Sequence, residues 1–520
     1  KTQYHLYYFG PDGAKMIGGV KILRKGQGIS HDSELPVGPL APLAEEFCSL
    51  GQSLDYYERL AELPRNIRDE ILEFLRDALV YPNHAASFIE AEAWRVSMTR
   101  DLDLESYKPL ALTLLERDYD ALPSVGLSLS FVMSGWTAPL ELDFAAPDNS
   151  EDVFGDGFPG PAIMLPDRAA VITGRNGSGK STLLARLARV LHASQFERAR
   201  APTSNLGKIA PAGIGFSRII AVAYSAFDTF HVPGVTLQDK KQIISDLRAG
   251  TGRYVFAGLR DIARELEERL SGVGDVESSD GSVEDELAPG FALDRQDITY
   301  LKSADQLADE YARTLERVVV AKRERLLSQS LLLLLADPSF SDVPDQSVAA
   351  LLEADPRETF MGWSTGHKIV MHMVTTLVAY AQPKAIILMD EPESHLHPPL
   401  LAALMHAVRL VLGKQDAFAV IATHSPVVAQ ETLGRHVSVI NRSGDVVTIL
   451  PPKIETYGES IGEITNEVFG LTAGSADFHA TLRSLVDRNL TLEQIEGRFD
   501  RRMSLQARAY VMSLIAARES

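Results

Sequence analysis

A glycine-rich segment in the middle of the chain limits the fold more than any other feature. It follows the apolar stretch 169–172 and precedes a helical pattern over 183–191. In such a loop backbone N–H groups surround phosphate oxygens, a lysine adds a point charge and a hydroxyl ligates magnesium. The segment predicts a nucleoside-triphosphate site, with ATP and Mg²⁺ as cofactors and Ser181 as a metal ligand. Its residues are Gly174, Arg175, Asn176, Gly177, Ser178, Gly179, Lys180, Ser181 and Thr182.

Two acidic residues follow a second buried-strand pattern, residues 384–389. Asp390 is placed to hold the magnesium water shell, and Glu391 to polarise the water that attacks the γ-phosphate. A third strand pattern, 417–422, ends close to His424, which we interpret as a switch histidine. The pattern therefore predicts ATP hydrolysis, with Glu391 and His424 as catalytic residues.

A turn at residues 361–368 precedes a further helical pattern over 369–381. Ser364, Thr365 and Gly366 resemble the signature loop of ABC-type ATPases, in which a hydroxyl, an amide and a helix N-terminus face a γ-phosphate. In that family the phosphate is bound by the other subunit. The resemblance therefore implies a homodimer or a higher homo-oligomer that pairs head to tail around ATP. The same Ser-x-Gly pattern is also a common helix cap and turn.

The segment after strand pattern 219–224 departs from the ABC-type pattern, because no convincing glutamine follows the strand. Asp228 or Ser225 is a candidate to take over the coupling of magnesium to the helical lobe. Asp228 is an equally good cap for a turn or a helix. We retain Asp228 as a third magnesium ligand beside Ser181 and Asp390, and the capping alternative stays open.

Residues 393–398 read Glu-Ser-His-Leu-His-Pro and resemble SMC-like and OLD-like ATPases of bacterial defence and repair more than transporters. The alternating His395 and His397, with Glu393 nearby, also have the composition of a metal site. No further ligand can be paired with them from the sequence, so we favour a subunit contact.

The lengths of two regions narrow the choice among these ATPase families. The helical region between the two ATPase halves is too short for long coiled-coil arms, and the last 70 or so residues are too few for a Toprim nuclease. Residues from about 127 to 470 resemble PtuA-type ATPases of the Septu and retron anti-phage systems, which are related to OLD-family and AriA ATPases. The resemblance implies that the C-terminal tail recruits an HNH nuclease, and it extends to a reverse transcriptase and its RNA or DNA.

Composition bears on location and partners. The 520 residues carry a formal net charge of −19, so any nucleic-acid contact needs a local basic patch that works against the overall field. No apolar run is long enough to cross a bilayer, and the single cysteine, Cys48, cannot form an internal disulfide. These features predict a cytoplasmic protein without a membrane partner.

We expect an α/β fold: an ABC-type P-loop ATPase head with an antiparallel β lobe, a helical insertion lobe and small terminal appendages. An aromatic of the β lobe, Trp136 or Phe144, is a candidate to stack on adenine, although a core role suits both. The expected parts are an N-terminal α+β region (1–120), a first ATPase half (121–230), the helical lobe (231–355), a second ATPase half (356–450) and a helical partner-binding tail (451–520).

The sequence supports one main function and leaves two alternatives open. The main expectation is an ATP-hydrolysing subunit of an anti-phage complex that controls an effector nuclease. The first alternative is a stand-alone SMC-like ATPase of DNA repair that uses its own basic patches. The second is a nucleotide-sensing oligomeric scaffold in which hydrolysis is incidental.

Overall fold

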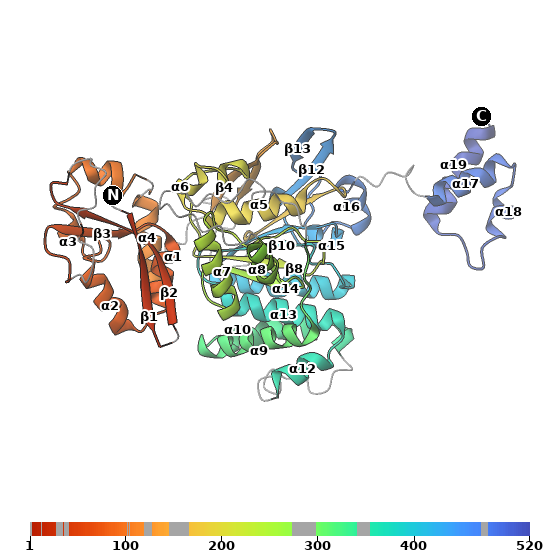
Figure 1. Cartoon of the computed structure of the whole chain (residues 1–520). Helices are drawn as coiled ribbons and strands as arrows, with labels where there is room; N and C mark the ends of the chain where they lie inside the picture. The colour runs from red at the N-terminus through yellow and green to blue at the C-terminus, as the bar shows by residue number, and fades with distance from the viewer. Residues whose placement is uncertain are drawn as a thin grey trace, which may run out of the picture.

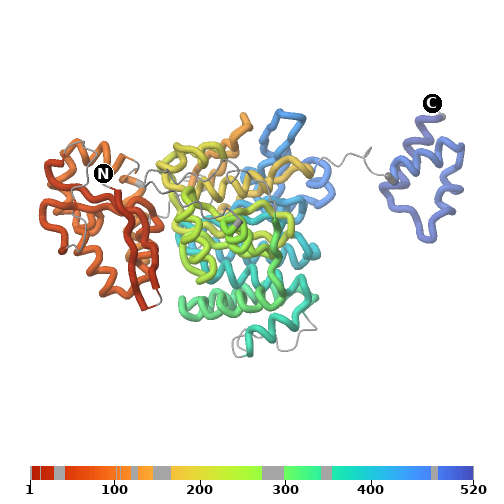
Figure 2. The backbone as a smooth tube through the Cα atoms, viewed as in Figure 1, coloured from red at the N-terminus to blue at the C-terminus, as the bar shows by residue number. Residues whose placement is uncertain are grey.

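The computed structural model describes residues 3–11, 13–27, 35, 41–100, 102, 104–118, 127–144, 166–272, 298–340, 354–469 and 477–519. A large α/β body lies between a smaller unit formed by the N-terminal residues and a group of short helices near the C-terminus (Figure 1). Figure 2 follows the backbone through these three parts in chain order.

The body is built on a seven-stranded sheet with the order β13-β12-β6-β11-β10-β8-β9. All neighbours are parallel except β12 and β13, which form an antiparallel hairpin at one edge. Helices cover both faces, which explains why the inner strands are continuous apolar runs rather than alternating patterns. The strands are β6 (Ala169–Gly174), β8 (Arg218–Ala223), β9 (Tyr254–Gly258), β10 (Ala385–Asp390), β11 (Phe418–Ala422), β12 (Val437–Ser443) and β13 (Val446–Leu450).

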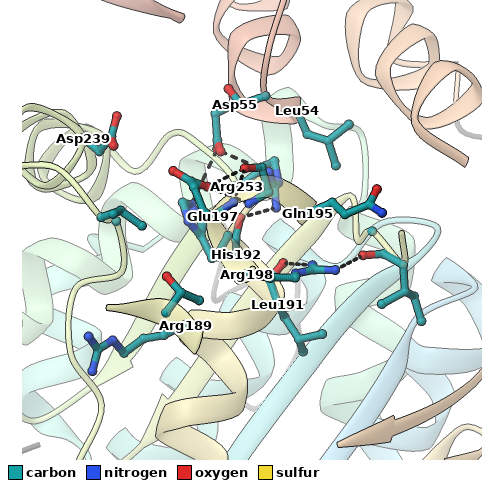
Figure 3. Close-up of a pocket in the computed structure, with 18 of the residues that line it drawn as sticks. Leu54, Asp55, Arg189, Leu191, His192, Gln195, Glu197, Arg198, Asp239 and Arg253 are labelled. Carbon is teal, nitrogen blue, oxygen red and sulfur yellow. Dashed lines mark hydrogen bonds and ion pairs between the residues drawn. The ribbon is translucent and has the colours of Figure 1, made fainter. Parts of the chain in front are cut away.

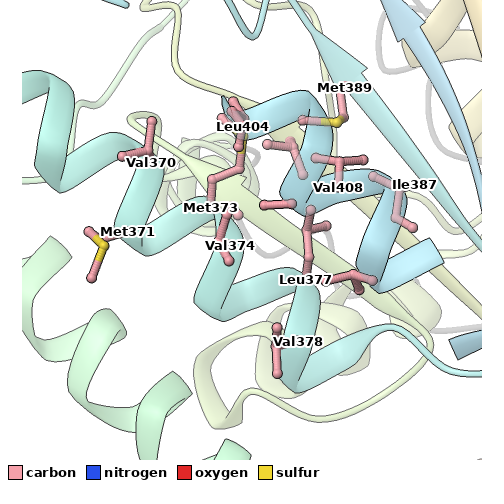
Figure 4. Close-up of a cluster of buried hydrophobic side chains, with 14 of the residues drawn as sticks. Val370, Met371, Met373, Val374, Leu377, Val378, Ile387, Met389, Leu404 and Val408 are labelled. Carbon is pink, nitrogen blue, oxygen red and sulfur yellow. The ribbon is translucent and has the colours of Figure 1, made fainter. Parts of the chain in front are cut away.

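Two hydrophobic cores lie on opposite faces of this sheet. One contains apolar side chains of α5 (Lys180–His192), α7 (Leu237–Ala249) and α8 (Ile262–Gly272). The other joins four helices, and Figure 4 shows α13 and α14 packing through Val374, Leu377 and Leu404 toward Ile387 of β10. These helices are α9 (Ala304–Val320), α10 (Glu324–Leu335), α13 (Thr365–Tyr380) and α14 (Pro398–Gln415).

A small antiparallel sheet with the order β5-β4-β7 contributes Phe131 and Leu140 to the same core as α5. Its strands are β4 (Ser128–Met133), β5 (Leu140–Asp143) and β7 (Gly207–Ala210). Together with the main sheet it confirms the predicted fold class, an α/β ATPase head with an antiparallel β lobe. Shorter helices complete the body: α6 (Gln195–Arg198), α12 (Pro356–Gly362), α15 (Pro426–Gln430) and α16 (Ile461–Glu467), with 3₁₀ turns at Thr203–Asn205, Pro338–Phe340 and Gly434–His436.

The range expected to be a helical lobe, 231–355, is only partly helical. It contains β9, which pairs with β8 and forms the other edge of the main sheet. A five-residue apolar run fits a short buried strand as well as a helix segment, so periodicity alone does not separate the two. The helical pattern over 304–335 is also divided in two, because Lys322 adopts a positive φ of 55° between α9 and α10. The acidic, serine- and glycine-rich segment 272–290, whose composition predicts a loop, lies from residue 273 on outside the described residues.

The N-terminal unit has a three-stranded antiparallel sheet, β1-β2-β3, covered by helices and by a short π-helix at Trp94–Met98. Strands β1 and β2 form a hairpin, and Cys48 is buried in this unit's core. The elements are β1 (Gln3–Gly10), β2 (Gly13–Arg24), β3 (Phe47–Gly51), α1 (Leu54–Ala61), α2 (Arg65–Phe74), α3 (Pro82–Ala85) and α4 (Leu104–Glu116).

One face of α1 docks the N-terminal unit on the body through charged groups. Asp55, Glu58, Arg59 and Glu62 share the helical spacing i, i+3, i+4 and i+7 and therefore lie on one side of the chain's first helix. Each of the four has a partner in the body. Asp55 meets Arg253 at 3.0 Å, Glu58 meets Arg218 at 2.7 Å, Arg59 meets Asp246 at 3.3 Å, and Glu62 accepts from the N–H of Gly252 at 3.2 Å.

The C-terminal helices form a small core of their own. Leu482, Val486, Ile495 and Val511 are buried among them. Leu505 on the last helix is 85% exposed. The helices are α17 (Asp477–Asp487), α18 (Leu492–Glu496) and α19 (Leu505–Glu519).

Candidate nucleotide-binding site

The phosphate-loop segment connects β6 to α5, as its sequence context predicts. Gly174, Gly177 and Gly179 all have φ between +77° and +153°, a region that L side chains rarely adopt. A Cβ on Gly174 would also lie 2.3 Å from the carbonyl oxygen of Ile440. Glycine is therefore required for both the turn and the close approach of β12, and the loop leaves its N–H groups at the start of α5.

Lys180 is almost fully buried at the base of this loop. Its Nζ donates to the carbonyl oxygens of Gly174 and Arg175 at 3.1 and 3.4 Å, and it lies 2.7 Å from Nε2 of His424. Burial lowers the pKa of Lys180, while the carboxylates of Glu391 and Asp390 oppose that shift. Burial, with Lys180 beside it, also lowers the pKa of His424, so the imidazole is neutral and accepts the lysine's hydrogen bond. The phosphate-binding lysine and the predicted switch histidine are thus partners.

Ser181 and Asp390 meet across the loop, with the serine Oγ donating to Oδ1 of Asp390 at 3.0 Å. Asp390 ends β10, and the parallel pairing puts it level with Ala223 of β8 and Ala422 of β11. A hydroxyl beside a carboxylate, at an edge where phosphate oxygens would complete the shell, is the hard oxygen donor set that Mg²⁺ prefers. The residues present therefore fit the predicted metal.

Glu391 has an unusual backbone for a non-glycine residue, with φ of 48°. Its N–H donates to the carbonyl oxygen of Ala422 at 2.9 Å, which ties the turn after β10 to the end of β11. Its Oε1 lies 3.8 Å from Nε2 of His424, and its side chain is 36% exposed. A carboxylate held at the open rim of the site is in position to orient a water molecule, which is the role predicted for a general base.

Glu393 holds the segment that carries His424, a role that sequence reasoning missed. Its two carboxylate oxygens accept from the N–H of His424 at 2.6 Å and from Oγ1 of Thr423 at 2.9 Å. Burial raises the pKa of Glu393, and these two hydrogen bonds oppose the shift. The spacing of Glu393 from Glu391 was visible in the sequence, but the partner segment is some thirty residues away and only the sheet brings it close.

Asp228 forms a buried ion pair rather than a direct link to the other predicted metal ligands. Its Oδ1 accepts from Arg260 at 2.6 Å and from the N–H of Phe230 at 3.0 Å, and both charged side chains are fully buried. Burial raises its pKa to about 6. Among the described hydrogen bonds none joins Asp228 to Ser181 or Asp390. Its Oδ2 is buried without a hydrogen-bond partner, so its role as a magnesium ligand stays a prediction.

The predicted signature residues start α13. Ser364 is the N-cap, and its Oγ accepts from the N–H of His367 at 3.3 Å. Ser364 and Thr365 are exposed, and the Gly366 backbone approaches the carbonyl oxygen of His395. No hydrogen bond or ion pair within the described part of the chain links these three residues to Lys180, Ser181 or Asp390. The structure therefore confirms the capping geometry and leaves the helix start open to another molecule.

One of the two histidines of segment 393–398, His397, has structural partners. The side chain of His397 caps α14 by accepting from the N–H of Leu400 at 3.4 Å, and its Nε2 lies 3.7 Å from Asp337. His395 adopts a positive φ of 69°. Across the described residues no group of three or more His, Cys, Asp or Glu side chains is arranged to hold a metal ion.

Trp136 lies against the phosphate loop, whereas Phe144 is part of the core. A Cβ built on Gly179 would lie 2.9 Å from the Trp136 indole ring, which is only partly buried. Phe144 is 3% exposed and packs on Phe418. The geometry thus separates two candidates that the sequence left equal, and only Trp136 is placed to meet a base.

Fold and site together have the architecture of a P-loop ATPase head. A family model described as "AAA domain, putative AbiEii toxin, Type IV TA system" matches residues 255–429, which include Asp390, Glu391 and His424. Over its whole length the chain is similar to protein ea59 of Escherichia phage lambda, with 29% identity over 525 residues that cover 93% of that protein.

Similar solved structures were also found, and two of them follow. A putative metal-chelate type ABC transporter is 14% identical, covers 67% of this chain and 86% of its own, and has a TM-score of 0.25. The SMC head domain from Thermotoga maritima is 13% identical, covers 64% of this chain and 100% of its own, and has a TM-score of 0.27. The fold assignment rests on the sheet topology rather than on these values. No helix within the described ranges is long and apolar enough to cross a membrane.

We expect the free energy of unfolding to depend on pH through the buried carboxyl group of Asp390. Burial raises the pKa of Asp390 to about 7; the hydrogen bond from Ser181 opposes the shift and the Glu391 carboxylate adds to it. Because the folded state holds the proton more tightly than the unfolded one, stability without nucleotide falls as pH rises from about 4 through 7. An asparagine side chain at this position cannot ionise. We therefore expect Asp390→Asn to gain about 2 kcal/mol over the wild type between pH 5 and pH 8 in urea unfolding.

The control for this comparison is Mg²⁺ with ATP at pH 8. It should stabilise the wild type and have little effect on Asp390→Asn, because the amide is a poor magnesium ligand. A stability difference that does not change with pH would contradict a raised pKa for Asp390.

Trp136 gives a second measurable expectation. Stacking of a base on an aromatic side chain contributes about 1 to 3 kcal/mol, so Trp136→Ala should weaken ATP binding at least about fivefold in calorimetry, and Trp136→Phe should keep most of it. Inorganic tripolyphosphate has no base and serves as the control, since its affinity should not change. Equal losses for ATP and tripolyphosphate would mean that Trp136 only supports the loop.

Proposed function

We propose that this protein is the ATP-hydrolysing subunit of an anti-phage defence complex, in which two copies pair head to tail around ATP and control an effector nuclease. The observation that carries the pairing is a site divided between two surfaces. Lys180, Ser181, Asp390 and Glu391 gather at one sheet edge, while the capped N-terminus of α13, with Ser364 exposed, has no phosphate site within its own chain's described residues. In a head-to-tail pair, the N-terminus of α13 in one copy would face the phosphate site of the other copy.

An exposed aromatic supports the same arrangement. Phe227 is 87% exposed, in the loop that follows β8 at the sheet edge where β10 ends in Asp390. A subunit contact at this edge would remove the ring from water. We propose that ATP and Mg²⁺ occupy this edge and that the ring lies in the subunit contact.

Complementation tests the pairing. Lys180→Ala removes the phosphate lysine from one half, and Ser364→Arg blocks the signature surface of the other half. Each variant alone should lose ATPase activity. A mixture should regain about a quarter of the wild-type rate, because half of randomly formed dimers are mixed and each of these keeps one intact site. If the mixture stays inactive while both variants remain folded, the head-to-tail arrangement is wrong.

The defence role rests on the comparisons and on the C-terminal helices. The matched family model carries the words "putative AbiEii toxin", and the similar full-length protein is encoded by a phage; both support a role in the conflict between phages and their hosts. The helices from α17 to α19 form a core of their own, with Leu505 85% exposed. We propose that this group recruits the effector, an HNH-type nuclease, in the cytoplasm, and that in a retron a reverse transcriptase with its nucleic acid joins the complex.

The division of the chain is part of the proposal. The N-terminal region to about residue 120 and the tail from 451 are appendages to an ATPase core, and β9 is assigned to the core rather than to the helical lobe.

Purification of the tagged chain from its native host tests the partner. Mass spectrometry should find an HNH nuclease with the wild type and lose it with Leu505→Glu. Val446→Glu, an equally drastic change at a residue that is 64% exposed, should retain it. A bare oligomer whose hydrolysis is stimulated by DNA would instead support the repair function. Full biological activity of Glu391→Gln would support the nucleotide-sensing scaffold.

A further inference from the structure

A cavity lies where the N-terminal unit meets the body, at the end of α5 opposite the phosphate loop (Figure 3). It encloses about 100 Å³ and is lined by α1, the last turn of α5, α6 and the beginning of α7. A cavity of about 10 to 15 Å³ already holds one water molecule, so this one has room for a larger guest. None of the residues assigned to the phosphate site lines it.

Two lining side chains are more than nine-tenths buried and have polar atoms without a hydrogen-bond partner. They are His192, through Nε2, and Arg253, through Nε. The carboxylate nearest to His192 is that of Asp55, at 3.7 Å, which is beyond hydrogen-bond reach. Burial lowers the pKa of His192 to about 4, so a neutral imidazole faces the cavity. A buried polar atom left unpaired costs about 1 to 3 kcal/mol, and a guest with polar atoms would remove that cost.

Arginines outnumber the acids that line the cavity. Four arginines line it, Arg59, Arg189, Arg198 and Arg253, against three acids, Asp55, Glu197 and Asp239. Two of the arginines are paired, Arg253 with Asp55 and Arg59 with Asp246, while Glu197 and Asp239 close the capping boxes of α6 and α7.

Arg198 is the least compensated of these arginines. It donates to the main-chain carbonyl oxygens of Val190, Leu191, Ala212 and Ile214, and to no carboxylate in the described part of the chain. Burial lowers its pKa to about 10, which still leaves it charged at neutral pH. Arg198 is partly buried, its hydrogen bonds all go to neutral carbonyl oxygens and its neighbouring acid is Glu197, so its charge can still attract an anionic guest.

Uncharged polar side chains such as Ser53 and Gln195 also line the cavity, and its apolar part includes Leu54, Leu102, Leu110, Leu206 and Ile243. We propose that this cavity binds a small organic anion, a carboxylate or phosphate ester on an apolar body of about one ring, and that its occupancy changes the affinity of the protein for ATP.

The proposed coupling follows from α5, and it rests on the phosphate site proposed above. This helix begins with Lys180 and Ser181 and ends with His192. Its 13 residues span about 20 Å as a single rigid element. A guest that holds the last turn in one position therefore acts on the phosphate loop at the other end. Reciprocity requires ATP to change the guest's affinity by the same factor.

Binding is tested first, on the whole chain without nucleotide. Benzoate and phenyl phosphate are the probes, and benzyl alcohol is the neutral control, with thermal unfolding and calorimetry as readouts. Both anions should bind and raise the Tm, and benzyl alcohol should not. Leu54→Trp, which fills the cavity, should abolish the effect, whereas Ile298→Trp at a surface position should keep it. Equal binding to Leu54→Trp, or equal binding of benzyl alcohol, would overturn the proposal. Ile214→Trp serves as a second cavity-filling variant if Leu54→Trp does not fold.

The coupling is tested by titrating a fluorescent ATP analogue with and without saturating benzoate. The affinity should change about fivefold or more in the wild type and not at all in Leu54→Trp. An effect that persists in Leu54→Trp would show competition at the phosphate loop, and no effect in the wild type would overturn the coupling. If the analogue does not bind to any variant, the ATPase proposal fails, while anion binding to the cavity is still measured independently.

Discussion

Glu391→Gln is expected to lose ATP hydrolysis about 10²- to 10⁴-fold and to keep ATP binding, because the amide cannot take a proton from the attacking water. Glu391 is a suitable position for separating ATP hydrolysis from ATP binding. Its backbone is fixed by the hydrogen bond to Ala422, and its side chain makes no hydrogen bond that the fold depends on within the described residues. Steady-state phosphate release measures the first effect, and calorimetry with Mg²⁺ and ATP the second.

The same variant should accumulate as an ATP-bound pair, since the nucleotide between the two copies is no longer consumed. Size-exclusion chromatography with light scattering should show a dimer with ATP and a smaller species with ADP. Glu393→Gln is the matched control at the neighbouring acid. It weakens the contact to the His424 segment and should lower the rate less than tenfold. Loss of hydrolysis of the same size in both variants would show that position 391 has no special chemical role.

The second large effect concerns the buried pair of Asp228 and Arg260. Arg260 also pairs with the buried Glu265, so the loss of Asp228 leaves the arginine with one carboxylate instead of two. Removal of one partner of a buried pair costs about 3 to 5 kcal/mol when the other charge is left without compensation. Arg260→Met leaves both carboxylates without the arginine and should lower the free energy of unfolding in urea by about that amount, and Asp228→Ala should lower it by less. The double variant should recover part of the Arg260→Met loss, since only Glu265 is then left without its partner.

Nucleotide distinguishes the two roles considered for Asp228. If the carboxylate only holds Arg260, Asp228→Asn should bind Mg²⁺ and ATP with unchanged dependence on magnesium. If it also contacts the metal's shell through its unpaired Oδ2, the magnesium concentration needed for ATP binding should rise. Magnesium titration at fixed ATP decides between them. A variant as stable as the wild type would contradict the structural role.

The local part of the nucleotide site could be predicted from the sequence. Glycines at fixed spacing are needed where φ is positive, and the carboxyl ends of parallel strands meet at one edge. The structure accordingly brings Lys180, Ser181, Asp390, Glu391 and His424 together, although their catalytic and metal-binding roles stay predictions.

Contacts between distant segments could not be predicted in the same way. The pairing of Asp228 with Arg260, the approach of Trp136 to Gly179, and the hold of Glu393 on the His424 segment depend on how layers pack. A charged or aromatic residue has no periodic signal that names its partner. Strand β9 was missed for a related reason, since a short apolar run is compatible with a helix until its neighbours are known.

The charged face of α1 has a consequence for any attempt to shorten the chain. Arg218, Asp246 and Arg253 belong to the body, yet each finds its opposite charge on that single helix. A fragment that begins after the N-terminal unit would expose to water a face that is buried in the whole chain, with three charges that have lost their partners, in β8, in α7 and just before β9. The N-terminal unit therefore contributes to the stability of the α/β body. A fragment without it is not expected to fold as stably as the whole chain.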